Sequence, residues 1–222
     1  MYQLIIFDWD GTLMDSAAKI SNCMRAAAID VGVDVPSIEA AKNVIGLGLT
    51  EAITILFPAA NRGQLSALSD AYRYQFLEAD DTEQALFDGV KEGLQQLDQK
   101  GVLLAVATGK SRAGLDRVFN SCGIKQFFTV SRCADETRSK PHPQMLHEIL
   151  DFTTIDASKA IMVGDTSFDM EMAHGANIDG LGAAYGVHSV DVLKKSGAIE
   201  IRHDFRAVLS WLLDQRVEKA FC

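Results

Sequence analysis

The chain has 222 residues, of which 48% are hydrophobic, so it can bury the core of one domain or of one domain with an insertion. Asp and Glu outnumber Lys and Arg by 30 to 21, the formal net charge is −9, and no basic run could follow a nucleic-acid backbone. The apolar stretches are far shorter than the roughly 20 residues of a membrane span. We therefore expect a cytoplasmic protein with neither nucleic acid nor a membrane as its partner.

The first predicted element is a strand, because the apolar run LIIF at 4–7 fits a strand buried on both faces of a parallel sheet. The run leads directly into DWDGT at 8–12, so two carboxylates lie at the carboxyl end of the strand, where open α/β sheets bind ligands. As turn residues, Asp8 and Asp10 would simply end the strand. As functional residues, one would attack an electrophile such as phosphorus, while the other would move protons and help to hold a divalent metal.

The segment after this strand, up to about residue 85, has helical rather than strand-like character. Cap and turn residues predict four helices, at 15–31 with Asp15 or Ser16 as the cap, from Pro36, at 51–57, and at 65–79. Because this insertion begins beside the two acids, we expect it to act as a lid. The alternative is a passive structural elaboration.

From Gly89 onward, predicted helices and strands alternate, which is typical of βαβ units. Strands are expected at 102–107, 127–131, 160–163, 179–183 and 199–201, and helices at 90–99, 111–122, 143–151, 167–174, 190–195 and 204–217. The fold class is therefore α/β, with a doubly wound, Rossmann-like parallel sheet and a helical cap inserted after the first strand. We expect a catalytic core formed by residues 1–14 and 86–222, and a cap domain formed by residues 15–85.

Three later strand or loop ends carry polar residues that could complete a site with the two acids. Thr108 and Gly109 follow a strand and precede a helix, a corner that binds phosphate oxygens or simply caps the helix. Lys140 precedes a proline-initiated helix and is either a site cation or an ordinary surface lysine. Asp165 ends another apolar run and Asp169 lies one helical turn later, so they either bind Mg²⁺ or stabilise the helix N-terminus.

These four segments, DWDGT at 8–12, TG at 108–109, KP at 140–141 and GDTSFD at 164–169, resemble the haloacid dehalogenase-like hydrolase superfamily in type, order and spacing. The inserted helical segment is similar to the cap of the subfamily that includes phosphoglycolate phosphatases and β-phosphoglucomutases. The resemblance covers essentially the whole chain, and it implies the roles of individual residues.

The resemblance implies that Asp8 is the nucleophile that forms an aspartyl phosphate, that Asp10 is the acid/base, and that Lys140 offsets the charge on the nucleophile and on the phosphoryl group. The residues implied to hold or brace the phosphate or substrate are Thr108, Gly109, Gly11 and Thr12, together with Gly46 in the cap loop at 45–50, which is alternatively a flexible turn. The implied cofactor is Mg²⁺, with a metal site formed by Asp8, the backbone carbonyl of Asp10, Asp165 and Asp169; the last residue is alternatively an anchor for Lys140. Further cap candidates for substrate contact are Lys42, Arg73 and Tyr74.

The expected function is a Mg²⁺-dependent phosphatase that hydrolyses a small phosphate monoester and resembles phosphoglycolate phosphatases. A phosphomutase of the β-phosphoglucomutase type is the first alternative, because both activities use the same core residues. A non-catalytic phosphate-binding module is the second alternative. The physiological substrate and the oligomeric state, monomer or homodimer, stay open.

Overall fold

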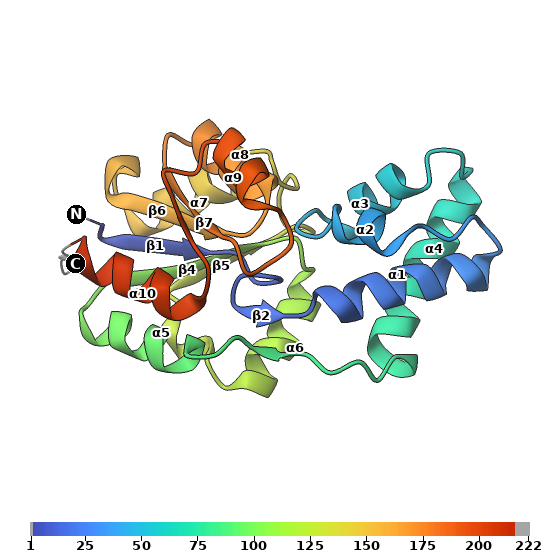
Figure 1. Ribbon diagram of the computed structural model, residues 1–222, viewed down its shortest axis with the longest axis horizontal. Helices are drawn as coiled ribbons and strands as arrows, with labels where there is room; N and C mark the ends of the chain where they lie inside the picture. Colours follow the sequence, from blue (N-terminus) through green and yellow to red (C-terminus); the bar gives the residue numbers. More distant parts are fainter. Residues whose placement is uncertain (1, 216–222) are drawn as a thin grey trace.

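A six-stranded parallel sheet forms the centre of the computed structural model, which describes residues 2–215 (Figure 1). Its strands are β1 (Leu4–Phe7), β4 (Leu103–Thr108), β5 (Val130–Cys133), β6 (Ala160–Gly164), β7 (Asp179–Ala183) and β8 (Glu200–Arg202). They are arranged in the order β5-β4-β1-β6-β7-β8, with every neighbouring pair parallel. The chain winds outward from β1 through β4 to β5 and then returns to β6, so the winding reverses beside β1. Ligands bind at such a reversal, outside the carboxyl ends of the strands.

Strand β1 is fully buried because both faces of the sheet are covered by helices. Ile5 and Phe7 belong to a core shared with α5 (Val90–Gln99), α6 (Arg112–Cys122) and α10 (Phe205–Asp214). Leu4 and Ile6 point to the other face and pack with α7 (Gln144–Thr153) and α8 (Ser167–Gly175). Figure 1 shows these two helical layers on opposite sides of the sheet, with α9 (Val190–Lys195) beside α8. The predicted α/β class and the doubly wound parallel sheet are confirmed.

The inserted segment is helical and lies beyond the carboxyl end of β1, to the right of the sheet in Figure 1. It consists of α1 (Ala17–Val31), α2 (Ile38–Lys42), α3 (Leu49–Leu56), α4 (Arg62–Tyr74) and a π-helical turn, η1 (Gln75–Ala79). These helices have their own hydrophobic core, which includes Met24, Ile53 and Leu68. The predicted helical insertion after the first strand is therefore confirmed.

Two very short strands connect the insertion to the sheet domain. β2 (Met14–Asp15) pairs antiparallel with β3 (Ala85–Leu86), so the chain enters and leaves the insertion at the same place. No strand pattern in the sequence predicts these two-residue elements. The expected boundaries at 14/15 and 85/86 fall on this pair, and the division into two domains stays a prediction.

Most element boundaries differ from the predicted ones by only a few residues. The strand expected at 127–131 begins at Val130, because residues Lys125–Phe127 form a 3₁₀ turn; a second such turn covers Ala157–Lys159. The helix expected at 65–79 begins at Arg62 and changes to π geometry after Tyr74. The expected end of the last helix at 217 lies outside the described residues. In the described part of the chain, no helix combines the length and the apolar character needed to cross a membrane.

Candidate active site

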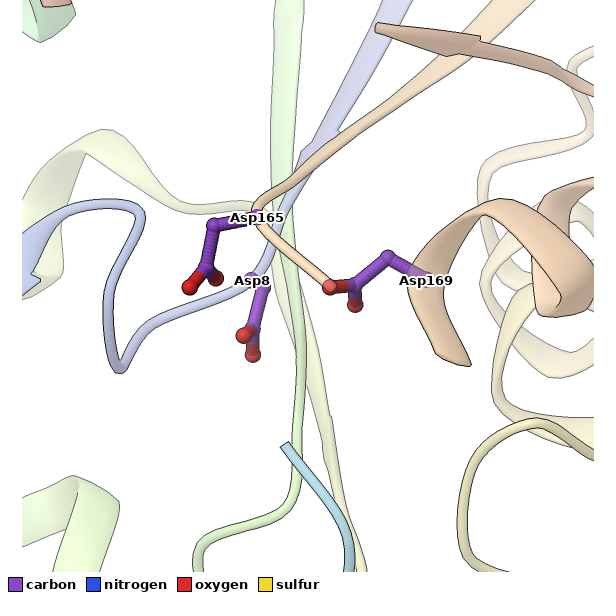
Figure 2. A group of neighbouring side chains, drawn as sticks. All are labelled: Asp8, Asp165 and Asp169. Atoms are coloured by element: carbon purple, nitrogen blue, oxygen red, sulfur yellow. The ribbon is translucent and has the colours of Figure 1, made fainter. Parts of the chain in front are cut away.

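Three buried carboxylates meet at the carboxyl end of the sheet. Asp8 follows β1, Asp165 follows β6, and Asp169 lies in the first turn of α8. One oxygen from each lies within 4.8 Å of the others, and Figure 2 shows Asp169 reaching from its helix toward the other two. Three acids this close in a buried site repel one another unless cations neutralise them.

Lys140 supplies one of these positive charges. Its Nζ lies 2.6 Å from Asp8 Oδ1 and 2.7 Å from Asp169 Oδ1. Only 1% of the residue is exposed, so the surface-lysine interpretation is wrong. Burial by itself lowers the pKa of Lys140, but the charges of Asp169 and Asp8 more than compensate and raise it above its usual value. The side chain is therefore an ammonium ion at neutral pH, held between two acids.

Asp8 retains unused capacity to bind a ligand. Burial, together with the charges of Asp169 and Asp165, holds the pKa of Asp8 well above its usual value, although Lys140 acts in the opposite direction. Among the described residues, Asp8 Oδ2 has no hydrogen-bond partner, and buried polar atoms are rarely left in that state. An unpaired carboxylate oxygen next to further carboxylates is the type of donor that Mg²⁺ prefers. The residues present therefore fit a divalent metal.

Asp165 is oriented by two segments that contact it, the loop at 11–12 and the loop at 186–187. Thr12 donates from its hydroxyl to Asp165 Oδ1 over 2.9 Å, and the Val187 amide donates to Oδ2 over 2.8 Å. Gly11, at φ +83°, packs so closely against this carboxylate that no side chain would fit. Burial first, and then the charge of Asp169, raises the pKa of Asp165 to about 7. Gly11 and Thr12 were expected at the phosphate; they contact Asp165 here, and a phosphate contact stays a prediction.

Asp169 combines two of the predicted roles. Its Oδ2 accepts from the Thr166 hydroxyl over 2.7 Å and from the Thr166 amide over 3.1 Å. The Asp169 amide donates to the Thr166 hydroxyl over 3.4 Å, so the two residues form a capping box at the start of α8. Its Oδ1 accepts from Lys140. With donors on both oxygens, Asp169 is better placed to anchor Lys140 than to offer a free ligand atom.

Asp10 faces different partners from Asp8. Its Oδ1 accepts from the Ser16 hydroxyl over 2.5 Å and lies 2.9 Å from Lys110 Nζ. Ser16 was predicted as a helix cap, and it occupies the N-cap position of α1, but its side chain makes no capping hydrogen bond. The sequence interpretation did not identify Lys110 as a site residue, although it directly follows Thr108 and Gly109. Each of the two acids after β1 therefore has an ammonium group of its own.

The loop between α2 and α3 lies against the carboxyl ends of β4 and β6. Gly109 abuts the backbone carbonyls of Gly46 and Leu47, so that a side chain at this position would collide with them. Gly46, at φ +99°, approaches the Thr166 side chain. On the same side, the Gly48 amide donates to the Ser139 hydroxyl over 2.8 Å, next to Lys140. Thr108, which precedes Gly109, is buried.

A second group of insertion residues faces Asp10. The Phe76 ring centroid lies 5.2 Å from Lys110 Nζ and 5.4 Å from Lys19 Nζ. The neighbouring Tyr72 stacks on Phe76 at 5.8 Å, and burial followed by the charges of Asp10 and Cys23 raises its pKa well above the usual value. The cap candidates taken from the sequence, Lys42, Arg73 and Tyr74, are instead exposed on the surface. No local sequence signal marked Lys19, Tyr72 or Phe76 as residues near the site.

Comparisons with known proteins agree with this fold and site. A family model described as haloacid dehalogenase-like hydrolase matches residues 5–183. The protein named "Probable phosphatase IndB" from Dickeya dadantii is 33% identical over 87% of this chain and 86% of its own length. A phosphoglycolate phosphatase from Psychrobacter arcticus is 27% identical over 95% and 96% of the two chains. The crystal structure of a predicted phosphatase from Clostridium acetobutylicum, 24% identical, superposes with a TM-score of 0.86 over 96% of this chain and 99% of its own.

One relative has a different named activity. The tyrosine-protein kinase PtkA of Mycobacterium tuberculosis is 30% identical over 90% of this chain and 68% of its own length. Relatives of similar sequence identity thus carry different named activities, so the similarity identifies the family rather than the particular reaction. From the family match, the buried acids and the inserted cap, the chain belongs to the haloacid dehalogenase-like hydrolases, as a phosphatase of the capped type with phosphoglycolate phosphatases among its relatives.

Proposed function

We propose that the protein is a Mg²⁺-dependent phosphatase that hydrolyses a small phosphate monoester, of the phosphoglycolate type, through an aspartyl phosphate. The observation that carries the proposal is the Asp8 carboxylate, which is buried, held by Lys140 and left with an unpaired Oδ2. This arrangement supports a nucleophile, because a desolvated carboxylate with a free lone pair can attack an electrophilic phosphorus.

In the first step, a carboxylate oxygen of Asp8 attacks phosphorus and the bond from phosphorus to the ester oxygen breaks. Asp10 gives a proton to the departing oxygen, so that the leaving group departs as an alcohol. Lys140 lies within 2.6 Å of Asp8 and offsets the negative charge that gathers on the transferring group. Thr108 and the Gly109 amide are the proposed donors to the phosphate oxygens.

In the second step, water attacks the phosphorus of the aspartyl phosphate. Asp10 takes a proton from this water, and the bond between phosphorus and the Asp8 oxygen breaks, which releases inorganic phosphate and restores both carboxyl groups. The insertion loop at Gly46 and Leu47 covers the Gly109 corner and supports a site that is shielded from bulk solvent.

Asp8 and Asp165 are the proposed side-chain ligands of Mg²⁺, with the Asp10 backbone carbonyl as a further donor. The ion would supply positive charge that orients the phosphate and stabilises the transition state. Asp169 would hold Lys140 in place, as its 2.7 Å contact indicates. A phosphomutase would use the same residues; hydrolysis is proposed because curated relatives that cover nearly the whole chain are phosphoglycolate phosphatases.

The test replaces the proposed nucleophile with its amide. Asp8→Asn keeps the size of the side chain but removes the charge that attacks phosphorus, so phosphate release from an aryl phosphate should fall by about a thousandfold or more. Phosphate release is measured with Mg²⁺ and with EDTA, and circular dichroism confirms folding. Asp88→Asn, at a fully exposed side chain, is the matched control and should retain wild-type activity. Wild-type turnover by Asp8→Asn would refute the proposal.

A panel of monoesters then tests the finer assignment. Phosphoglycolate, sugar phosphates, nucleotides and pyrophosphate are compared by kcat/KM. β-Glucose 1-phosphate is included with its bisphosphate as the mutase substrate. Formation of glucose 6-phosphate without free phosphate would favour the mutase alternative over hydrolysis.

A further inference from the structure

His188 lies in the loop after β7 and contacts three separate parts of the molecule. Its backbone amide donates to the Asp165 carbonyl over 3.1 Å, and its ring Nδ1 accepts from the Ser167 amide, at the start of α8, over 2.9 Å. The ring also forms a hydrogen bond with the backbone of Asn43, which belongs to the insertion. His188 thus connects the sheet domain with the inserted helices.

The Ser167 amide determines which ring nitrogen of His188 carries the proton. An amide N–H can donate only to an unprotonated nitrogen, so Nδ1 is the acceptor and the proton lies on Nε2. Burial lowers the pKa of His188, although the hydrogen bond to the Asn43 backbone acts in the opposite direction, so the ring is mainly neutral at pH 7. The Nε2–H group is then the donor that faces the Asn43 carbonyl. The ring therefore bridges an amide of α8 and a carbonyl of the insertion, with one matched hydrogen bond on each side.

The loop that carries His188 also holds Asp165, the proposed metal ligand. The Val187 amide donates to Asp165 Oδ2 over 2.8 Å, and Gly186 lies so close to this side chain that a Cβ atom there would collide with it. Residues 186–188 therefore contact Asp165 at three consecutive positions. Because these are contacts of the backbone, a shift of the loop would also shift the carboxylate.

Phe168 extends the contact between this loop and the insertion. Its ring centroid lies 5.6 Å from that of His188, and the ring packs against an apolar cluster of the insertion that includes Leu47. The Leu47 carbonyl in turn abuts Gly109, the proposed donor to the phosphate. A continuous series of contacts therefore runs from the metal ligand through His188 to the insertion loop at 43–48, which covers the phosphate corner.

We propose that His188 is a positioning residue of this phosphatase, which couples the insertion loop at 43–48 to the metal ligand Asp165. When the metal is bound, Asp165 and residues 186–188 are held in place, so the His188 ring stays where it bonds to Asn43 and the loop opens less often. By thermodynamic linkage, a closed loop favours metal binding to the same extent. This inference rests on the proposed Mg²⁺-dependent activity and adds a residue that acts through Asp165 and the loop rather than on the substrate.

The experiment separates the two hydrogen bonds of the ring. His188→Gln keeps an N–H donor as many bonds from the backbone as Nε2, whereas His188→Asn keeps an oxygen acceptor as many bonds away as Nδ1. His188→Ala removes both, and His203→Asn, at an exposed histidine between β8 and α10, is the matched control. Hydrogen exchange at the hydrogen-bonded amides of Ile45, Leu47 and Gly48 is measured with EDTA and with Mg²⁺. The Mg²⁺ concentration that gives half-maximal phosphate release is measured in parallel.

In the wild type and in His203→Asn, Mg²⁺ should slow exchange at these three amides by about twofold to tenfold, the scale of one neutral hydrogen bond. His188→Ala and His188→Asn, which lack the bond to Asn43, should lose this response and should need about twofold to tenfold more Mg²⁺ for half-maximal activity. His188→Gln should keep most of both properties. The amides of β1 and β6 should keep their protection in every variant.

A wild-type loop that does not respond to Mg²⁺, or a His188→Ala loop that responds as the wild type does, would overturn the inference. If His188→Ala does not fold, the Asn and Gln variants decide the question, and equal behaviour of these two would overturn it. Faster exchange throughout β1 and β6 in the variants would mean a purely structural role and would overturn it as well. Failure of the wild type to release phosphate from any ester would overturn the proposed function, whereas the exchange measurement needs no substrate and still decides the coupling.

Discussion

Lys140 and Lys110 each neutralise one of the two acids that follow β1. The sequence predicted Lys140 as the cation of this site and did not identify a separate cation for Asp10. In the structure, Lys140 pairs with Asp8 and Lys110 with Asp10, while Ser16 holds the same Asp10 oxygen. Different surroundings allow neighbouring carboxyl groups to take different roles, one as a nucleophile and one as a proton carrier.

Asp165 gives the site a testable dependence on pH. Its pKa is about 7 in the folded chain, against about 4 for an unfolded Asp. Between these values the folded state holds a proton that the unfolded state has lost, so the free energy of unfolding of the metal-free protein should fall as pH rises from about 4 to about 7. Mg²⁺ binds the ionised form, so the increase in Tm caused by Mg²⁺ should grow as pH rises through about 7.

Thermal melts with EDTA and with Mg²⁺, recorded from pH 5.5 to pH 8.5, measure this effect. Asp165→Asn is the matched variant, because an amide keeps the size of the side chain and can accept one of the two hydrogen bonds, from Thr12 or from Val187, but cannot ionise. This variant should lose both the added stability at low pH and the response to Mg²⁺. An equal Mg²⁺ effect at every pH in the wild type would contradict the prediction.

At the scale of elements, one loop of the insertion determines how the cap meets the core. The loop between α2 and α3 packs its Gly46 and Leu47 carbonyls against Gly109, and its Gly48 amide bonds to Ser139. Because Gly109 has no side chain, the loop can lie directly against the backbone that follows β4. The close contact therefore depends on a glycine after β4 as much as on the loop itself.

Replacing this glycine should displace the loop. In Gly109→Ala the methyl group would collide with the two carbonyls, so the loop has to move, and kcat/KM should fall by about ten- to a hundredfold, since small shifts of positioned groups are costly. Steady-state kinetics measures the effect. Gly63→Ala, on the exposed surface of α4 with one side-chain atom at 3.3 Å, should change kcat/KM by less than about twofold. Equal activity of the two variants would show that the contact does not position the site.

At the scale of the whole molecule, the hydrophobic core is divided. The sheet is packed on both faces by helices, whereas α1, α3 and α4 bury a separate core around Leu68 and Ile53. A local defect in the inserted helices should therefore leave the sheet intact, because the two groups of buried side chains are separate.

Leu68→Ala tests this separation. Leu68 is fully buried, so its truncation should destabilise the inserted helices by about 2–5 kcal/mol. Hydrogen exchange should become faster at the amides of α1 and α4, while the amides of β1, β4 and β6 keep their protection. Ile29→Ala, at a side chain in α1 that is 67% exposed, should change neither region. Faster exchange throughout the sheet in Leu68→Ala would mean that the two cores unfold together.

The sequence predicted the site residues best where acidic side chains directly follow a buried strand. Asp8 and Asp165 could be placed together because the carboxyl ends of parallel strands lie at the same edge of a sheet. Lys140 could be added only through the family resemblance, because its own segment was equally compatible with a surface lysine. The alternation of apolar runs and amphipathic segments predicted a parallel sheet covered by helices, because this alternation is typical of βαβ units. Errors at element ends were small, as in β5, where a 3₁₀ turn delays the strand to Val130.

Contacts across the insertion could not be predicted. Ser16 was interpreted as a helix cap because a hydroxyl at that position usually bonds the backbone, but its partner is Asp10. Lys19 and Phe76 are far apart in sequence and meet only when α1 packs beside α4 and η1. Their arrangement depends on tertiary packing, which a local pattern does not record.

The pairing of β2 with β3 has an evolutionary consequence. Because the chain leaves the core and returns to it at one point, the length and sequence of the intervening helices can change without altering the order of the sheet strands. The residues that surround Asp8 come from outside these helices, whereas Lys19, Tyr72 and Phe76 come from within them. A lineage built on this plan can acquire a new substrate range by exchanging the inserted segment, while its phosphate chemistry is inherited unchanged.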